Sequence, residues 1–349
     1  MKLGVNLGYW GAGNDAENLE VAREADRLGY SVVWAAEAYG SDAATVLSWI
    51  AAQTTSIDVG SAIFQIPGRS PANCAMTAAT LDSLSGGRFR LGLGVSGPQV
   101  SEGWHGVRFD KPLQRTREYV DIVRLALSRQ RVTYQGDYFT LPLPDGPGKA
   151  LTLTVHPVRE NIPIYLASIG PKNLELTGQI ADGWHAIFFA PEHAASVMAP
   201  IIKGRESVGL TMAGFDVNPT VPVVFAPTVE EAAEWVRPYA ALYVGGMGSR
   251  DTNFYNQLMS RMGYEDAAIE IQNRYLEKDY NGAAAAVPLE FLDQTSLLGP
   301  PARVAERLSA FADAGVTTLT AASFAGSLSE RVQTLRVLTD VFAASGLAD

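Results

Sequence analysis

Short apolar runs alternate along the chain with longer segments in which hydrophobic residues recur every three or four positions. Apolar runs bounded by turn residues are typical of buried strands, and the longer periodic segments are typical of amphipathic helices. Strands are predicted at residues 2–7, 31–37, 57–65, 88–95, 162–168, 182–189, 218–226 and 316–323. Helices are predicted at residues 14–30, 42–54, 71–87, 170–181, 192–209, 228–244, 300–315 and 328–343.

This alternation indicates parallel strands that are covered by helices. A count of eight strands in a chain of 349 residues favours an α/β fold of the (β/α)8 TIM-barrel type. An open, doubly wound sheet is the alternative. We expect the whole chain, residues 1–349, to form one domain.

Two stretches interrupt the alternation, at about residues 130–160 and 245–298. The first contains a Tyr- and Phe-rich segment around Gly136 and is predicted as a hairpin-like insertion before the fifth strand. The second contains helical pieces and the segment NGAAAA (281–286), which is expected to be flexible. We expect both to be barrel insertions without a core of their own. Insertions at the carboxyl ends of barrel strands usually cover the active site.

The fourth strand contains Gly92, Gly94 and Gly97 in the spacing of the dinucleotide-binding fingerprint G-x-G-x-x-G. In that fingerprint the glycines follow a strand and open a helix. Here Phe89, Leu91, Leu93 and Val95 alternate with the first glycines, so these glycines belong to the strand itself. The pattern therefore argues against a dinucleotide fold. Two explanations for glycines on this strand remain: they leave space for a ligand, or they relieve crowding inside the barrel.

Composition narrows the possible partners. The net charge is −10 without a block of like charges, which disfavours nucleic acid and anionic membranes as partners. The single cysteine, Cys74, excludes an intramolecular disulfide and fits a reducing cytoplasm. The first residues do not read as a signal peptide, and no apolar run is long enough to predict a membrane span. The four histidines lack the spacing of a metal site.

Four segments in order resemble the bacterial luciferase-like flavin and deazaflavin oxidoreductases. They are SVVWAAEAYGSDA (31–43), VGSAIFQIPGRSPANCAMTAATLD (59–82), LDSLSGGRFRLGLGVSGPQVSEGWHG (81–106) and LASIGPKNLELTGQIADGW (166–184). The elements G-P-K and I-A-D-G-W are frequent in the branch that uses coenzyme F420, a 5-deazaflavin. The resemblance implies a luciferase-like TIM barrel, an oxidoreductase that transfers a hydride to or from a small organic substrate, and a homo-oligomer, namely a dimer.

The resemblance also implies where the cofactor binds. Its phosphodiester and acidic tail need N–H donors and a cation, which Ser168, Gly170, Pro171 and Lys172 offer at the start of a helix. The ring system is expected against a non-proline cis peptide between Ala62 and Ile63. Ser96, Gly97 and Ser101 in the third segment complete the expected cofactor site.

Glu37 ends the second strand and is the expected catalytic residue, because carboxylates at the carboxyl ends of barrel strands are often catalytic. Burial beside the ring would favour its neutral form as a proton donor. An ion pair or a helix-capping contact is the alternative. Family members that oxidise alcohols tend to carry His after this acid, whereas this chain has Ala38. We therefore expect the reductive direction.

Two other functions remain open at this stage. A monooxygenase of the same superfamily would use reduced FMN, whose single phosphate usually needs an Arg or Ser cluster. The second alternative function is a barrel that binds a flavin-like ligand without turnover.

Five aromatic residues are expected either to wall an apolar pocket or to pack in the core: Trp10, Tyr39, Trp104, Trp184 and Phe188.

Overall fold

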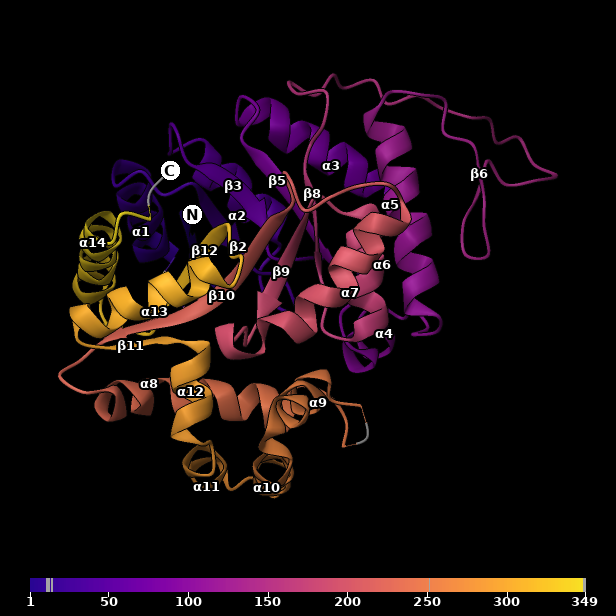
Figure 1. Ribbon diagram of the computed structural model, residues 1–349. Coiled ribbons are helices and arrows are strands. Elements are labelled where there is room, and N and C mark those ends of the chain that lie inside the picture. Colours follow the sequence, from indigo (N-terminus) through magenta and orange to yellow (C-terminus); the bar gives the residue numbers. More distant parts are fainter. Residues whose placement is uncertain (11–12, 14, 251, 348–349) are drawn as a thin grey trace.

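The computed structural model describes residues 1–10, 13, 15–250 and 252–347, which form a closed barrel of parallel strands ringed by helices (Figure 1). The eight barrel strands are β1 (Lys2–Asn6), β2 (Val32–Ala35), β3 (Asp58–Ser61), β5 (Phe89–Gly94), β8 (Ile164–Ala167), β9 (Gly183–Ile187), β10 (Asp216–Phe225) and β12 (Thr318–Ser323). Each pairs in parallel with its neighbour, and β12 pairs with β1 to close the ring. The predicted TIM barrel is confirmed, and the open sheet is excluded.

Helices connect successive strands on the outside of the barrel. They are α1 (Asp15–Arg27), α2 (Ala43–Ala51), α3 (Pro71–Leu84), α4 (Pro98–Gly103), α5 (Pro112–Leu127), α6 (Pro171–Ile180), α7 (Ala194–Ser207), α13 (Pro301–Asp313) and α14 (Leu328–Ala344). Side chains cap several of them: Asp42 accepts from Thr45 N at the start of α2, and Ser327 forms a capping box with Glu330 at the start of α14. Among the described residues, no helix is both long and apolar enough to cross a membrane.

The third predicted strand, residues 57–65, is broken in two. β3 ends at Ser61, and a short strand β4 (Phe64–Gln65) continues beside β5, followed by the turn η1 (Ile66–Gly68). The peptide bond between Ala62 and Ile63 is cis, as the resemblance implies. The backbone therefore forms a bulge on the third strand at the carboxyl end of the barrel.

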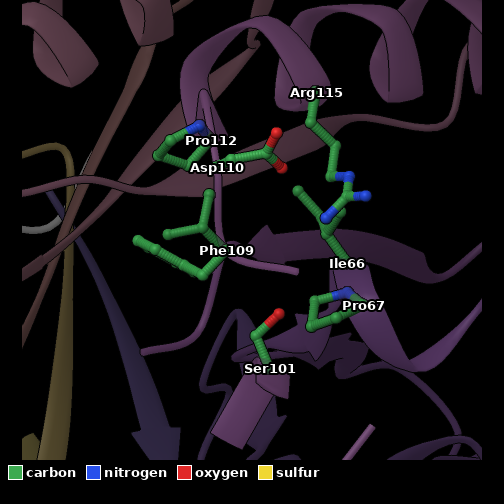
Figure 2. A pocket seen from close by; sticks show the side chains of 8 residues that line it. Ile66, Pro67, Ser101, Phe109, Asp110, Pro112 and Arg115 are labelled. Atoms are coloured by element: carbon green, nitrogen blue, oxygen red, sulfur yellow. The ribbon is translucent and has the colours of Figure 1, made fainter. Parts of the chain in front are cut away.

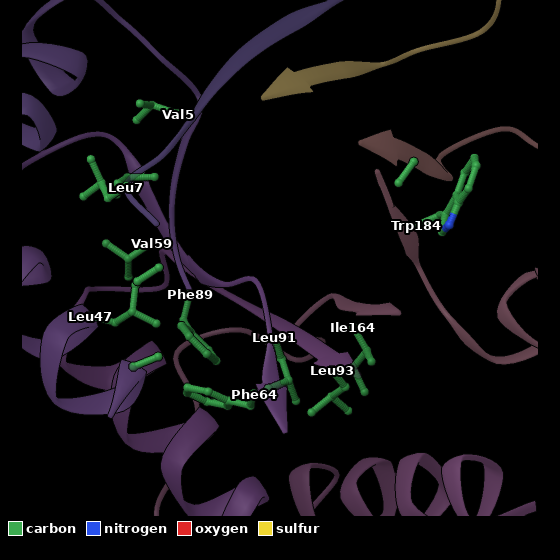
Figure 3. Close-up of a cluster of buried hydrophobic side chains, with 14 of the residues drawn as sticks. Val5, Leu7, Leu47, Val59, Phe64, Phe89, Leu91, Leu93, Ile164 and Trp184 are labelled. Carbon is green, nitrogen blue, oxygen red and sulfur yellow. The ribbon is translucent and has the colours of Figure 1, made fainter. Parts of the chain in front are cut away.

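The two faces of β5 explain its glycines. Phe89, Leu91 and Leu93 face the helices and belong to the main hydrophobic cluster (Figure 3). The alternate positions face the barrel interior, where a Cβ at Gly92 would overlap the Ser61 carbonyl oxygen and lie 2.6 Å from His185 Nε2. A Cβ at Gly94 would lie 2.8 Å from Ile63 Cδ1. The glycines therefore relieve crowding inside the barrel, which was one of the two explanations left open.

The second insertion is larger than the sequence indicates. It comprises α8 (Val229–Ala241), η3 (Leu242–Gly246), α9 (Phe254–Met259), η4 (Ser260–Tyr264), α10 (Glu265–Leu276), α11 (Tyr280–Ala285), α12 (Leu289–Thr295) and β11 (Leu297–Gly299), which pairs with β10. We predicted α8 as a barrel helix, but α13 is the helix that leads from β10 to β12. The segment NGAAAA was expected to be flexible, yet most of it lies in α11.

These helices lie together at the carboxyl end of the barrel, in the lower part of Figure 1. They bury a hydrophobic cluster that is separate from the main one and includes Val236, Val244, Met259 and Phe291. The expectation that the insertion lacks a core of its own is therefore wrong. The insertion forms a second layer over the carboxyl ends of the strands.

The first insertion contains the predicted hairpin, formed by the antiparallel strands β6 (Tyr134–Gln135) and β7 (Thr140–Leu141). It connects the end of α5 to the start of β8, so it lies at the amino end of the barrel (Figure 1). The fully buried carboxylate of Asp82 accepts from the backbone N–H of Val158 and from the Arg159 guanidinium, which ties the end of the insertion to α3. This insertion therefore lies away from the carboxyl ends of the strands.

Candidate functional site

Glu37 lies just beyond β2, where both of its carboxylate oxygens are occupied by donors. Arg69 binds it through two N–H···O contacts, of 2.5 Å to Oε2 and 2.7 Å to Oε1. The backbone N–H of Ala43 and that of Gln65 donate to the same carboxylate at 3.3 and 3.2 Å. The side chains of Glu37 and Arg69 are only 10% and 11% exposed.

This arrangement corresponds to the alternative of an ion pair with a helix-capping contact, since Arg69 and the backbone N–H of Ala43, the first residue of α2, both bind the carboxylate. That Glu37 is the catalytic residue stays a prediction. Arg69 is itself shared with Asp42, which accepts from it at 2.5 Å. Glu37 therefore joins the end of β2 to the start of α2 and to the bulge on the third strand.

Gln65 carries this network from the bulge to the next strand. Its Nε2 donates to Ser96 Oγ at 2.8 Å, and its Oε1 lies 2.9 Å from His105 Nε2. Ser96 has a left-handed backbone (φ 62°), which turns the chain sharply after β5. Gly97 follows and caps the short helix α4. That Ser96 and Gly97 bind the cofactor stays a prediction. Gln65 was not predicted, because its contacts are with residues 31 and 40 positions away.

Ser101 lies on α4 and is only 1% exposed. Its hydroxyl donates to the Val107 carbonyl at 2.7 Å, so its one hydrogen-bond donor is already used inside the protein. Figure 2 shows it in a narrow pocket whose wall also includes Ile66, Pro67, Phe109 and Arg115. The contacts of Ser101 therefore support a structural role in closing the loop after α4.

The residues after β8 form the start of α6. Gly170 precedes the helix, Pro171 is its first residue and Lys172 its second. The N–H groups of Lys172 and Asn173 lie in the first turn, where a helix offers no acceptor, and Lys172 is exposed. Ser168 is buried instead, with its hydroxyl 2.5 Å from Thr177 Oγ1 and its carbonyl bound by the Trp184 indole. The start of α6 thus presents the N–H groups of Lys172 and Asn173 and the Lys172 ammonium at the barrel rim, whereas Ser168 supports the loop behind them.

Aromatic side chains gather at the same end of the barrel, between the strands and the second insertion. The ring centroids of Tyr239 and Tyr243 are 4.7 Å apart, and those of Tyr243 and Tyr255 are 4.9 Å apart. Phe188, at the end of β9, packs against all three. Tyr9, which follows β1, contacts the Tyr243 hydroxyl. We call Tyr9, Tyr239, Tyr243, Tyr255 and Phe188 the aromatic wall.

Burial raises the pKa of every phenol in the aromatic wall, that of Tyr255 to about 12. The hydroxyls are therefore protonated at neutral pH and can donate hydrogen bonds. The sequence pointed only to Phe188 of this set. Of the other aromatic candidates, Trp10 and Trp184 are buried, whereas Tyr39 and Trp104 are exposed.

His185 lies in the barrel interior and is a core histidine. Its ring is stacked on Tyr165 at 5.1 Å and meets Trp34 edge-on at 4.4 Å. Burial is the main reason why its pKa falls to about 4, so the imidazole is neutral at pH 7. His105, in contrast, lies at the rim beside Gln65 and Gly68.

Comparison with known proteins agrees with this geometry. A protein of Mycobacterium tuberculosis that is named as a coenzyme F420-dependent oxidoreductase is 41% identical over 345 residues, which cover 97% of this chain and 99% of that protein. The 5,10-methylenetetrahydromethanopterin reductase of Archaeoglobus fulgidus is 28% identical over 86% of this chain and 87% of its own length. The coenzyme F420-dependent tetrahydromethanopterin reductase of Methanopyrus kandleri has the same fold, with a TM-score of 0.82 at 21% identity over 97% of both chains.

The model of the luciferase-like monooxygenase family matches residues 6–318, which include the six barrel strands from β2 to β10, the last residue of β1 and the first residue of β12. The match therefore extends over both insertions. This chain belongs to the luciferase-like monooxygenase family.

Proposed function

We propose that this protein is a coenzyme F420-dependent oxidoreductase that reduces a small organic substrate. The observation that carries the cofactor assignment is the 41% identity, over almost the whole chain, to a protein named for this cofactor. The donor set at the rim fits the same group. An anion finds the free N–H groups of α6 and the ammonium of Lys172 there, and helix N-termini favour negative charge.

Different residues of the chain would hold different parts of the cofactor. Gly170, Pro171 and Lys172 would bind the phosphodiester. The bulge at Ala62 and Ile63 would support the ring, with Ser96 and Gly97 beside it on the next strand. When bound, the reduced deazaflavin supplies a hydride.

Glu37 acts in this proposal as a positioning residue. It accepts the N–H of Gln65 directly after the bulge and is itself held by Arg69. Its two oxygens already accept from four donors, so neither is free to face a substrate. We therefore assign protonation of the substrate to another group.

The aromatic wall offers that group. Tyr9 is 47% exposed and follows β1, which is separated from β3 and its bulge only by β2. Its phenol stays protonated, since burial raises its pKa. The substrate carbon would accept the hydride while the Tyr9 hydroxyl gives its proton to the adjacent atom, and the phenolate would be reprotonated from water. This chain has Ala38 where family members that oxidise alcohols tend to have a histidine base, which agrees with the reductive direction.

Anaerobic single-turnover assays test the proposal. Reduced coenzyme F420 is mixed with the protein and with a panel of carbonyl compounds and activated alkenes, and the return of the oxidised cofactor's absorbance is followed. We expect reoxidation without oxygen, and a decrease of about 10²-fold for Tyr9→Phe. Tyr39→Phe, which changes an exposed phenol, is the matched control. Reoxidation that requires oxygen would instead identify a monooxygenase.

A further inference from the structure

The order of the strands divides the mouth of the barrel into two parts. β3, β5 and β8 are consecutive in the sheet, and the residues assigned to the cofactor follow these strands. The aromatic wall belongs to the part formed by β9, β10, β12 and β1, which are also consecutive. Phe188 follows β9, Tyr9 follows β1, and the insertion that carries the other three tyrosines lies between β10 and β12. A substrate beside a ring that rests on the bulge would therefore lie against the aromatic wall.

The aromatic wall is partly uncovered, although it lies between the strands and the insertion. Tyr9 is 47% exposed, and the three tyrosines of the insertion are half-buried. Phe324, which follows β12, adds a further ring, whose centroid lies 5.1 Å from that of Tyr239. Aromatic rings bind other flat rings by stacking and by edge-on contacts, which a puckered, saturated ring cannot reproduce. The wall is therefore suited to a flat ligand.

The surroundings of the wall are also uncharged. Burial, and after it the neighbouring tyrosines, raises the pKa of Tyr239 and of Tyr255; among the residues that the structure describes, no Lys or Arg lowers it and no Asp or Glu raises it further. A carboxylate or phosphate beside these two phenols would lose water without meeting a cation, which is costly. The Tyr255 hydroxyl has no hydrogen-bond partner in the described part of the chain, so it can donate to a carbonyl oxygen.

We propose that the aromatic wall selects an uncharged, flat substrate, namely a carbonyl compound whose carbonyl group is conjugated with a planar ring system, and discriminates against substrates that carry a carboxylate or phosphate. The inference rests on the proposed function, since it takes the hydride-donating ring to lie on the bulge. The rings of the wall recognise the flat part of the substrate, and the phenol hydroxyls recognise its carbonyl oxygen. An anionic group is disfavoured because nothing at the wall neutralises it.

The test is a calorimetric titration of the protein, saturated with oxidised coenzyme F420, with ligands that are not turned over. β-Naphthamide is flat and neutral, β-naphthoate has nearly the same shape but a negative charge, and the carboxamide of decalin is neutral but puckered. β-Naphthamide is expected to bind at least about tenfold more tightly than β-naphthoate and about fivefold more tightly than the decalin carboxamide. The proposed substrate class would be overturned if β-naphthamide did not bind, or if either of the other ligands bound as tightly.

A variant that gains binding cannot be explained by misfolding. Tyr9→Lys places an ammonium at the half-exposed edge of the wall, so β-naphthoate should bind about tenfold more tightly than it binds to the parent, whereas β-naphthamide should not. Leu84→Lys adds the same charge at the exposed last residue of α3, at the amino end of the barrel, and is the control. No gain with Tyr9→Lys, or an equal gain with Leu84→Lys, would overturn the role of the aromatic wall and leave the proposed function standing. Failure of the parent to bind coenzyme F420 would instead overturn the proposed function.

Discussion

At the scale of single residues, Glu37 shows how a plausible catalytic position is changed by its neighbours. Its place at the end of β2 suggested a proton donor, but Arg69 and two backbone N–H groups use both of its oxygens. We expect Glu37→Gln to destabilise the bulge, with a loss of about 2–4 kcal/mol in the free energy of unfolding, because Arg69 would lose a buried partner. Cofactor binding should weaken in parallel.

Denaturant unfolding and cofactor titration check this prediction together. Glu37→Gln should show a lower unfolding midpoint and weaker binding, and Asp42→Asn, which removes the more exposed partner of Arg69, should show a much smaller change. A Glu37→Gln variant with normal stability and normal binding, but turnover slowed by 10²-fold or more, would restore Glu37 as the general acid.

Lys172 carries the second prediction at this scale. It is exposed and close to free N–H groups, so its contact with a phosphodiester would be partly screened. Lys172→Ala is expected to weaken cofactor binding by about tenfold and to leave the unfolding midpoint unchanged. The matched control is Lys203→Ala, one helix further on. Unaltered binding by Lys172→Ala would place the phosphodiester elsewhere.

At the scale of elements, β5 depends on the absence of side chains on its inner face. At Gly92 a Cβ would overlap the Ser61 carbonyl, which belongs to a rigid strand, whereas at Gly94 it would meet the movable end of the Ile63 side chain. Gly92→Ala should therefore cost about 3 kcal/mol or more, and Gly94→Ala clearly less. Thermal unfolding of both variants measures the difference. Equal losses would show that the strand can shift away from Ser61.

The apolar periodicity predicted the elements well because burial is a local property of a strand or helix. All eight barrel strands appear where Val, Ile, Leu and aromatic residues gather, and the hairpin appears around Gly136. The assignment of α8 failed for a different reason. Its amphipathic pattern shows that one face is buried, but not that this face packs against α11 and α12 rather than against the barrel.

The same limit applies to the candidate site. Gly170, Pro171 and Lys172 could be predicted to lie at a helix start because the residues that begin a helix are consecutive in the sequence. Arg69 and Gln65 could not, because each acts through partners about 30 residues or more away. The aromatic wall joins residues from β1, β9 and the second insertion, and only the folded chain brings Tyr9 to Tyr243.

At the scale of the whole molecule, the barrel interior makes stability depend on pH through His185. The folded protein holds its pKa at about 4, against an ordinary value of 6.5. Between these values the unfolded chain binds a proton that the folded chain does not, so the free energy of unfolding rises with pH across this window. About 3 kcal/mol, present above pH 6.5, should be lost as the pH falls to 4.

Urea unfolding at a series of pH values measures this slope. The parent should lose stability steadily from pH 6.5 to 4, and His185→Gln should show a flatter profile over the same range, whatever its absolute stability. Identical profiles for the two proteins would mean that folding does not lower the pKa of His185.

The proposed function depends on the cofactor that the protein binds, so the most direct measurement compares the binding of deazaflavin with that of flavin. The protein is titrated with oxidised coenzyme F420 and with FMN under the same conditions, and binding is followed by fluorescence. We expect coenzyme F420 to bind at least about tenfold more tightly, since its acidic tail adds negative charge beside the N–H groups of α6 and Lys172. Binding of FMN that is as tight as or tighter than that of coenzyme F420 would contradict it.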